Sequence, residues 1–311
     1  MTAKVISFIN LKGGVGKTTC CVNIAGEFAN SHKKVLVIDV DAQSNTSILL
    51  MNPERYINDI LLQNQNHEAS KEEIISKTVY QIFLDAIEKK EKFDFENVII
   101  NSVVRYKETQ PLPKLDLLPA SFHLHELEQK IVTYKRTQYI ILNKALEKIK
   151  EQYDLILIDC PPNLYTATMN ALYASDYYVI PALPEKLSLF GIELLIKELN
   201  EVIEIAEEES DKSVKLAGIL LNNVIKSGNS RSGFINAHGV GIEDIKQKFS
   251  DFKEKGSIDK KAKVFDTMIH QRTSLREAAS EFIPMCIYKP RDESTAQFKQ
   301  VCAEILEQIN D

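Results

Sequence analysis

Short apolar runs alternate along the chain with longer stretches in which apolar residues recur at helical spacing. Within the runs the apolarity is continuous and β-branched residues are frequent, which is typical of strands buried on both faces of a parallel sheet. The predicted strands are Val5–Ile9, Val35–Ile38, Val98–Ile100, Leu115–Leu118, Leu155–Ile158, Tyr177–Ile180 and Leu216–Leu221, with Val264–Ile269 as a further one. The predicted helices are Thr18–Ala29, Leu124–Tyr134, Gln138–Gln152, Leu187–Glu208 and Ser294–Ile309.

This order of elements predicts an α/β fold: a single doubly wound domain over residues 1–311, with a mostly parallel sheet and helices on both faces. The 311 residues, 44% of them apolar, supply enough material for one large core. Two stretches look like additions to this frame. Residues 51–114 are polar and partly helical over Glu72–Lys90, and residues 226–262 are rich in Gly, Ser and Lys.

Composition excludes several classes of protein. A net charge of −6 argues against a surface that is basic throughout, although a local basic patch remains open. No apolar run reaches the roughly 18–20 residues that span a bilayer, and no signal peptide is expected, so we predict a cytoplasmic protein. The five cysteines, at positions 20, 21, 160, 286 and 302, lack Cys-x-x-Cys spacing, so we expect buried thiols and neither a disulfide framework nor a zinc site.

A glycine-rich segment directly follows the first predicted strand and opens the first predicted helix. It runs Lys12-Gly13-Gly14-Val15-Gly16-Lys17-Thr18-Thr19 and fits the pattern G-x-x-x-x-G-K-[ST], except that Leu11 stands at its first glycine. Glycines let backbone N–H groups approach phosphate oxygens, and the start of the helix adds a positive end. Residues 12–19 are therefore predicted to bind a nucleotide, with Lys17 on the β- and γ-phosphates and the Thr18 hydroxyl on Mg²⁺.

Two of the predicted strands end in acidic residues. Asp39 and Asp41 follow Val35–Ile38, and Asp159 follows Leu155–Ile158. Open α/β sheets bind their ligands at the carboxyl ends of the strands. An apolar strand that ends in Asp, downstream of a phosphate loop, has the form of a Walker B motif, so Asp159 is predicted to hold Mg²⁺ through a water. A polar strand end without chemistry remains the alternative for Asp39 and Asp41.

The glycine-rich segment resembles the deviant Walker A motif of the ParA/MinD ATPases, a branch of the P-loop NTPases. The mark of this motif is an additional lysine, which is Lys12 in this chain. The resemblance implies an ATPase that uses ATP and Mg²⁺ and forms a homodimer enclosing two ATPs. Lys12 would then contact the phosphates in the partner's site and act as a catalytic residue together with Lys17.

Residues 39–46 resemble the family's Asp-x-Asp-Pro-Gln-Gly-Asn segment. The chain departs from it with Ala42 in place of Pro and Ser44 in place of Gly. The resemblance implies that Asp41 positions or activates the attacking water and that Asp39 supports the Mg²⁺ site. Further along the chain, Asn222 and Asn223 follow a predicted strand where the base lies in this fold, so a hydrogen bond to adenine is predicted; a simple strand-end turn is the alternative.

Local charge suggests contact with DNA. Residues 226–276 contain 11 Lys or Arg and 6 Asp or Glu, an excess that favours binding to a phosphate backbone without reading bases, while a solvated lysine-rich loop stays open. Residues 264–278 resemble the family's C-terminal signature, but Gln271 and Ser274 stand where Arg is frequent, so the contacts do not transfer one for one. The candidate DNA-binding residues are Arg231, Lys260, Lys261, Lys263, Arg272 and Arg276.

The resemblance favours a partition ATPase that segregates plasmids or chromosomes. It implies a dimer that forms on ATP, binds double-stranded DNA non-specifically and is released when a ParB-like centromere-binding protein stimulates hydrolysis, in a cytoplasmic, nucleoid-associated setting. A MinD-like membrane ATPase is an alternative, disfavoured because residues 304–311 are acidic and not a basic amphipathic helix. A metabolic ATP-dependent ligase of the same fold is another.

Overall fold

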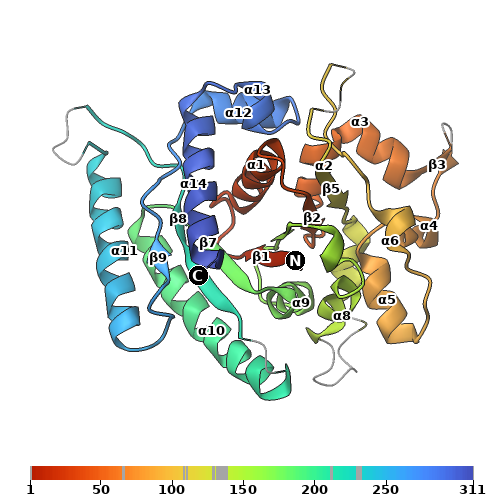
Figure 1. Cartoon of the computed structure of the whole chain (residues 1–311), viewed down its shortest axis with the longest axis horizontal. Helices are drawn as coiled ribbons and strands as arrows, with labels where there is room; N and C mark the ends of the chain where they lie inside the picture. Colours follow the sequence, from red (N-terminus) through yellow and green to blue (C-terminus); the bar gives the residue numbers. More distant parts are fainter. Residues whose placement is uncertain are drawn as a thin grey trace.

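A seven-stranded sheet forms the centre of the computed structural model, which describes residues 2–64, 67–107, 109, 111–127, 130, 139–210, 213–228 and 233–310 (Figure 1). The strand order is β5-β2-β6-β1-β7-β8-β9, and every neighbouring pair is parallel. The strands are β1 (Lys4–Phe8), β2 (Val35–Asp39), β5 (Leu115–Leu118), β6 (Leu155–Asp159), β7 (Tyr177–Ala182), β8 (Lys215–Leu221) and β9 (Lys263–Val264). Because all of them run the same way, the loops that follow them share one edge of the sheet.

Helices cover both faces of this sheet, which confirms the predicted fold class. Side chains alternate along β1, so that Ile6 and Phe8 enter one core and Val5 enters the other. The first core is covered by α1 (Lys17–Asn30), α2 (Asn45–Met51), α3 (Pro53–Tyr56), α12 (Thr273–Ser280), α13 (Met285–Tyr288) and α14 (Glu293–Asn310). The second is covered by α5 (Tyr80–Glu88), α8 (Ile141–Leu146), α9 (Thr166–Ala174), α10 (Lys186–Ser210) and α11 (Asn236–Glu254).

Two of the predicted strands are wrong in whole or in part. Residues 95–98 form the short helix α6 (Phe95–Val98), and of the predicted strand Val98–Ile100 it is Ile100 that forms a bridge to the sheet, antiparallel to Leu117. The run at 264–269 is a strand only at its start, in β9. Beyond it the chain still follows β8, since the Ile269 N–H donates to the Leu221 carbonyl, but regular pairing has ended. Apolar runs mark burial, and burial alone does not fix pairing.

The stretch at 51–114 adds small elements beside β5. They are α3, the π-helical turn η1 (Ile57–Leu61), the hairpin of β3 (Leu62–Asn64) and β4 (His67–Glu68), α4 (Lys71–Ser76), α5 and α6. The predicted helix at 124–134 begins as the 3-10 turn η2 (Phe122–Glu126), and residues 128, 129 and 131–138 lie outside the described part of the chain. The predicted helix at 138–152 is reduced to α8 and the turn η4 (Lys150–Gln152).

The stretch at 226–262 consists mainly of α11, which the composition did not predict. Its glycines lower helix propensity, but Gly241 has a packing role. A Cβ at Gly241 would lie 2.2 Å from the Pro184 carbonyl oxygen, so α11 packs closely on the turn that begins α10. The division into one domain with two additions stays a prediction. Of the described helices, none has both the length and the apolarity needed to cross a membrane.

Candidate nucleotide site

The glycine-rich loop between β1 and α1 is held open by glycine backbone geometry and by one amide. Gly14 and Gly16 have positive φ values of 74° and 87°, a conformation that glycine adopts without the clash a Cβ would make. The Asn222 side chain, at the end of β8, donates from Nδ2 to the Val15 carbonyl at 2.8 Å. A Cβ at Gly16 would lie 2.0 Å from that same nitrogen, so Gly16 and Asn222 fit together as a pair.

Lys17 lies folded into this loop. Its side chain is buried, with Nζ 3.4 Å from the Lys12 carbonyl oxygen. Burial lowers the pKa of Lys17, and the nearby charge of Asp159 opposes that shift. A cation held in a partly dry loop at the start of a helix is suited to binding phosphate oxygens.

The carboxylate of Asp159 sits directly beneath the loop, at the end of β6. Its Oδ2 accepts two hydroxyls, from Thr18 at 2.6 Å and from Thr46 at 2.7 Å. Its Oδ1 is buried and accepts no hydrogen bond from the residues that the structure describes. Burial raises the pKa of Asp159 to about 6, and the two threonine bonds oppose that shift.

An orphaned buried carboxylate oxygen beside a hydroxyl is what a Mg²⁺ site needs from the protein. Mg²⁺ is usually bound by one or two carboxylates while water and substrate phosphates complete its shell. Thr18 and Asp159 therefore fit the predicted metal. The described residues contain no cluster of three or more His, Cys, Asp and Glu side chains that could hold a metal ion.

The second acid, Asp39, is bonded to the protein through both carboxylate oxygens, and its support of the Mg²⁺ site stays a prediction. It lies beside Asp159, because the two residues are register partners on β2 and β6. However, its Oδ1 accepts the Asp41 N–H at 3.1 Å, and its Oδ2 accepts the Ser47 N–H at 2.9 Å and hydroxyl at 2.7 Å. Burial, followed by the charge of Asp159, raises the pKa of Asp39 to about 8. In this structure Asp39 therefore anchors the turn that carries Asp41.

The remaining predicted nucleotide-binding residues lie around the loop. Val15 is buried, nothing lies within 4 Å of where a Cβ at Gly13 would sit, and the Thr19 carbonyl accepts the Asn23 side chain within α1. Asn222 supports the loop through one N–H of its amide, and its contact with adenine stays a prediction. Asn223 is exposed, with a φ of 57°.

Lys12 points away from the loop's interior. Its Nζ forms an ion pair with Glu185 Oε2 at 2.9 Å, and both side chains are partly exposed. Its N–H donates to Asn10 Oδ1 at 2.9 Å, and the Asn10 amide in turn holds the Pro181 carbonyl at 2.7 Å. Lys12 is thus fixed to the loop after β7, at the edge of the site.

The predicted DNA-binding residues do not form one patch. Lys260 and Lys261 are exposed and precede β9. Arg272 and Arg276 follow it, on the side where the carboxyl ends of the parallel strands lie. Lys263 pairs with Glu304 at 3.2 Å and with Glu307 at 3.5 Å. Arg231 lies outside the described residues.

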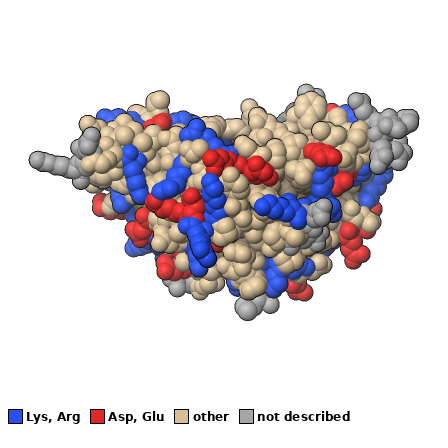
Figure 2. All heavy atoms as spheres, turned by 90° about the horizontal axis from the view of Figure 1, so that it is seen from above, with Lys and Arg blue, Asp and Glu red and all other residues tan. Residues whose placement is uncertain are grey.

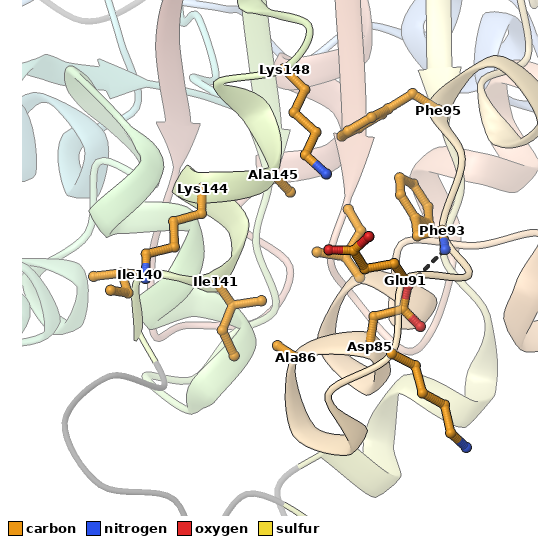
Figure 3. A pocket seen from close by; sticks show the side chains of 12 residues that line it. Asp85, Ala86, Glu91, Phe93, Phe95, Ile140, Ile141, Lys144, Ala145 and Lys148 are labelled. Atoms are coloured by element: carbon orange, nitrogen blue, oxygen red, sulfur yellow. Dashed lines mark hydrogen bonds between the residues drawn. The ribbon is translucent and has the colours of Figure 1, made fainter.

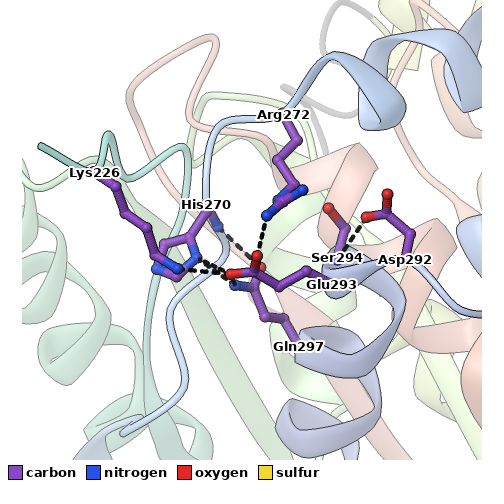
Figure 4. Close-up of polar contacts among 7 residues, drawn as sticks. All are labelled: Lys226, His270, Arg272, Asp292, Glu293, Ser294 and Gln297. Atoms are coloured by element: carbon purple, nitrogen blue, oxygen red, sulfur yellow. Dashed lines mark hydrogen bonds and ion pairs between the residues drawn. The ribbon is translucent and has the colours of Figure 1, made fainter. Parts of the chain in front are cut away.

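A single carboxylate, that of Glu293 at the start of α14, forms ion pairs with three basic side chains, one of which is Arg272 (Figure 4). It pairs with Lys226 at 2.7 Å, with His270 at 3.1 Å and with Arg272. These contacts, that of Lys226 first, lower the pKa of Glu293 to about 2. On the face shown in Figure 2, Lys and Arg side chains likewise lie among Asp and Glu side chains, with no unbroken basic surface.

A separate hollow of about 340 Å³ lies between α5 and α8 (Figure 3). Its walls are mostly apolar, and lysines stand at its rim. None of the predicted site residues lines it. The lining includes Ile82, Phe93, Phe95, Ile141, Lys144 and Lys148.

Several residues of the site carry no sequence signal that could have identified them. Glu185 is 173 positions from Lys12 in the chain, and Thr46 is 113 positions from Asp159. Only the parallel strand order brings these pairs together. Glu293 lies one residue before the predicted helix Ser294–Ile309, and nothing in the helical pattern indicates which cations it binds.

The fold and the site together define a P-loop nucleotide-binding protein. The chain belongs to the AAA domain family (AAA_31), whose model matches residues 3–212. It is 29% identical to the sporulation initiation inhibitor protein Soj of Bacillus subtilis over 97% of this chain and 98% of that protein. The chromosome-partitioning ATPase Soj of Treponema pallidum is 28% identical over 97% of each chain. These relatives confirm the resemblance to ParA/Soj ATPases.

Solved structures share the fold at lower identity. A Cyanothece McdA variant in complex with ATP superposes with a TM-score of 0.69 at 17% identity, covering 99% of this chain and 97% of that one. A plasmid partition protein of Borrelia burgdorferi bound to AMPPNP gives 0.63 at 20%, covering 98% and 99%. Cobyrinic acid a,c-diamide synthase of Mycobacterium smegmatis, with an ATP analogue and magnesium, gives 0.67 at 19%, covering 99% and 96%. At these identities the likeness concerns the fold alone.

Proposed function

We propose that this protein is a partition ATPase, which binds ATP and Mg²⁺ at the loop between β1 and α1 and couples hydrolysis to the segregation of DNA. The single observation that carries the proposal is the joint placement of Lys17, Thr18 and Asp159, with a free buried carboxylate oxygen, in a chain similar to Soj proteins over nearly its full length. Mg²⁺, when bound, would offset charge on the phosphates. Lys17 and the loop amides would orient those phosphates, and Asp41 would hold the attacking water.

The proposed active form is a homodimer. Lys12 lies at the edge of the loop. From there, in a dimer, it would contact the phosphates bound by the second copy, as a cation supplied in trans. Glu185, the ion-pair partner of Lys12, is followed two residues later by an apolar stripe on α10. In this stripe Leu187, Phe190 and Leu194 are 75%, 72% and 51% exposed. Large exposed apolar side chains at helical spacing are typical of a surface that another chain covers.

The proposed cargo is double-stranded DNA, bound without sequence preference, and a ParB-like protein would stimulate hydrolysis in the cytoplasm, at the nucleoid. The region around Arg272 supports this proposal, since Arg276 is exposed and Lys226 and Arg272 lie together on Glu293. Backbone binding of this kind weakens steeply with salt.

The test combines ATPase rate, oligomeric state and DNA retention. Wild-type protein is expected to dimerise with MgATP and to retain duplex DNA at low salt, and Lys12→Ala is expected to bind ATP yet stay monomeric. The exposed Lys33→Ala is the matched control and should behave as wild type. ATP turnover with no DNA retention but with pelleting on anionic liposomes would favour a membrane ATPase. Turnover that requires a small-molecule acceptor would favour a synthase.

A further inference from the structure

The Thr46 hydroxyl occupies a position that neither the phosphate loop motif nor the Walker B motif provides for. Thr46 is the second residue of α2, is fully buried, and donates to Asp159 Oδ2 at 2.7 Å. The same oxygen accepts the Thr18 hydroxyl at 2.6 Å. Two hydroxyls from different elements therefore converge on one carboxylate oxygen and leave the other oxygen, Oδ1, open.

The position of Thr46 links this carboxylate to the turn that carries Asp41. The next residue, Ser47, donates both its N–H and its hydroxyl to Asp39, and its hydroxyl accepts the Ala120 N–H at 3.0 Å. The first turn of α2 is thus fastened to both strand-end acids, and the segment that leads into it begins at Asp41. The Thr46 hydroxyl is thus the side-chain contact between the Asp159 carboxylate and α2, beside the backbone bond from the Val40 N–H to the Asp159 carbonyl at 3.1 Å.

We infer that Thr46 is a positioning residue of the Mg²⁺ site, which fixes Asp159 for the metal and couples metal binding to the turn that holds Asp41. This inference rests on the proposed function. A hydroxyl that holds one carboxylate oxygen fixes the direction of the other, and groups that orient metal ligands in this way typically change metal affinity 10- to 100-fold when removed.

The experiment measures binding of a fluorescent ATP analogue while Mg²⁺ is titrated, in wild-type protein, Thr46→Val and Thr46→Ser. Valine has the same shape without the hydroxyl, and serine keeps the hydroxyl. Thr46→Val is expected to raise the Mg²⁺ concentration for half-maximal binding about tenfold. Thr46→Ser is expected to stay within about twofold of wild type, because it retains the bond. Affinity for the analogue in EDTA should be equal in all three proteins, which also shows that each is folded.

A matched control is Thr168→Val in α9. Thr168 is equally buried, but its hydroxyl has no partner in the described structure, so the Mg²⁺ requirement should not move. The inference is overturned if Thr46→Val keeps the wild-type Mg²⁺ requirement, or if it only lowers the melting temperature and weakens binding equally with and without Mg²⁺. Failure of wild-type protein to bind the analogue in a Mg²⁺-dependent manner would instead overturn the proposed function, and this inference with it.

Discussion

The nucleotide edge of the sheet and the cluster around Glu293 both hold charged groups, but they satisfy those charges in opposite ways. At the nucleotide edge Lys17, Asp39 and Asp159 are almost completely buried, and one oxygen of Asp159 has no hydrogen-bond partner in the described part of the chain. In the cluster the Glu293 and Arg272 side chains are each 37% exposed, and they are paired with each other. The first region keeps one carboxylate oxygen that no described residue satisfies, and the second pairs its carboxylate with cations of its own.

This difference separates two kinds of binding site. A buried group with an unmet bond gains strongly from one specific ligand, because no water replaces that ligand. Exposed cations that are already paired with a carboxylate bind an anionic ligand weakly and in a salt-dependent way. Their net free energy of binding is the difference between the new ion pair and the one that is given up. Nucleotide binding should therefore depend on single residues, and DNA binding on a balance of charges.

The largest expected effect comes from Lys17→Ala. Removing the buried cation from the loop should weaken ATP binding at least about 100-fold, or roughly 2.8 kcal/mol. Equilibrium binding of a fluorescent ATP analogue at constant Mg²⁺ measures it. The exposed Lys33→Ala again serves as the control, and a Lys17→Ala protein that hydrolyses ATP normally would contradict the placement of the nucleotide.

The buried carboxylates give a second test, through the pH dependence of stability without nucleotide. The pKa of Asp39 is raised from near 3.8 to about 8, so the folded state binds this proton more tightly than the unfolded chain does. The free energy of unfolding attributable to Asp39 therefore falls as pH rises through this window.

Asp39→Asn removes that titration. The stability lost between about pH 5.5 and pH 8 should be smaller in this variant by about 2 kcal/mol, measured by urea unfolding. The exposed Glu243→Gln changes the net charge equally and should keep the wild-type slope. An Asp39→Asn slope identical to that of wild type would mean that Asp39 is ionised in the folded protein throughout this range.

A smaller effect is expected at the exposed cluster. Glu293→Gln releases Lys226 and Arg272 from their shared carboxylate, so affinity for duplex DNA should rise about threefold at low salt and fall more steeply with added salt. Glu307→Gln makes the same charge change beside Lys263 and is the matched control. If the DNA affinity of both variants rises equally, net charge and not the cluster governs binding. If only the affinity of Glu307→Gln rises, the contact surface lies around Lys263 in β9.

The sequence predicted the parts of the molecule that are built from local patterns. The central strands, the glycine loop and Asp159 at the end of β6 are each marked by apolar continuity or residue order within a few positions. Contacts between distant segments carry no such mark. Asn222 supports the glycine loop because β8 lies two strands from β1, and Glu293 binds cations from two other segments. α11 was missed because its glycines lower propensity while serving close packing at Gly241.

The smallest expected effect concerns the turn before α2, where the chain departs from the family's glycine. Ser44 has a φ of 56°, a left-handed conformation that costs a residue with a Cβ about 1 kcal/mol. Ser44→Gly relieves this strain but makes the unfolded chain more flexible, so a net increase of about 0.5 kcal/mol in the free energy of unfolding is expected in urea.

Asn223→Gly, at a φ of 57° on an exposed loop, is the comparison variant. Asparagine tolerates this conformation, so the increase should be smaller still. Equal gains at both positions would show that serine at position 44 is no more strained by the left-handed conformation than asparagine at position 223. A loss at Ser44 alone would show that its side chain stabilises the turn that carries Asp41.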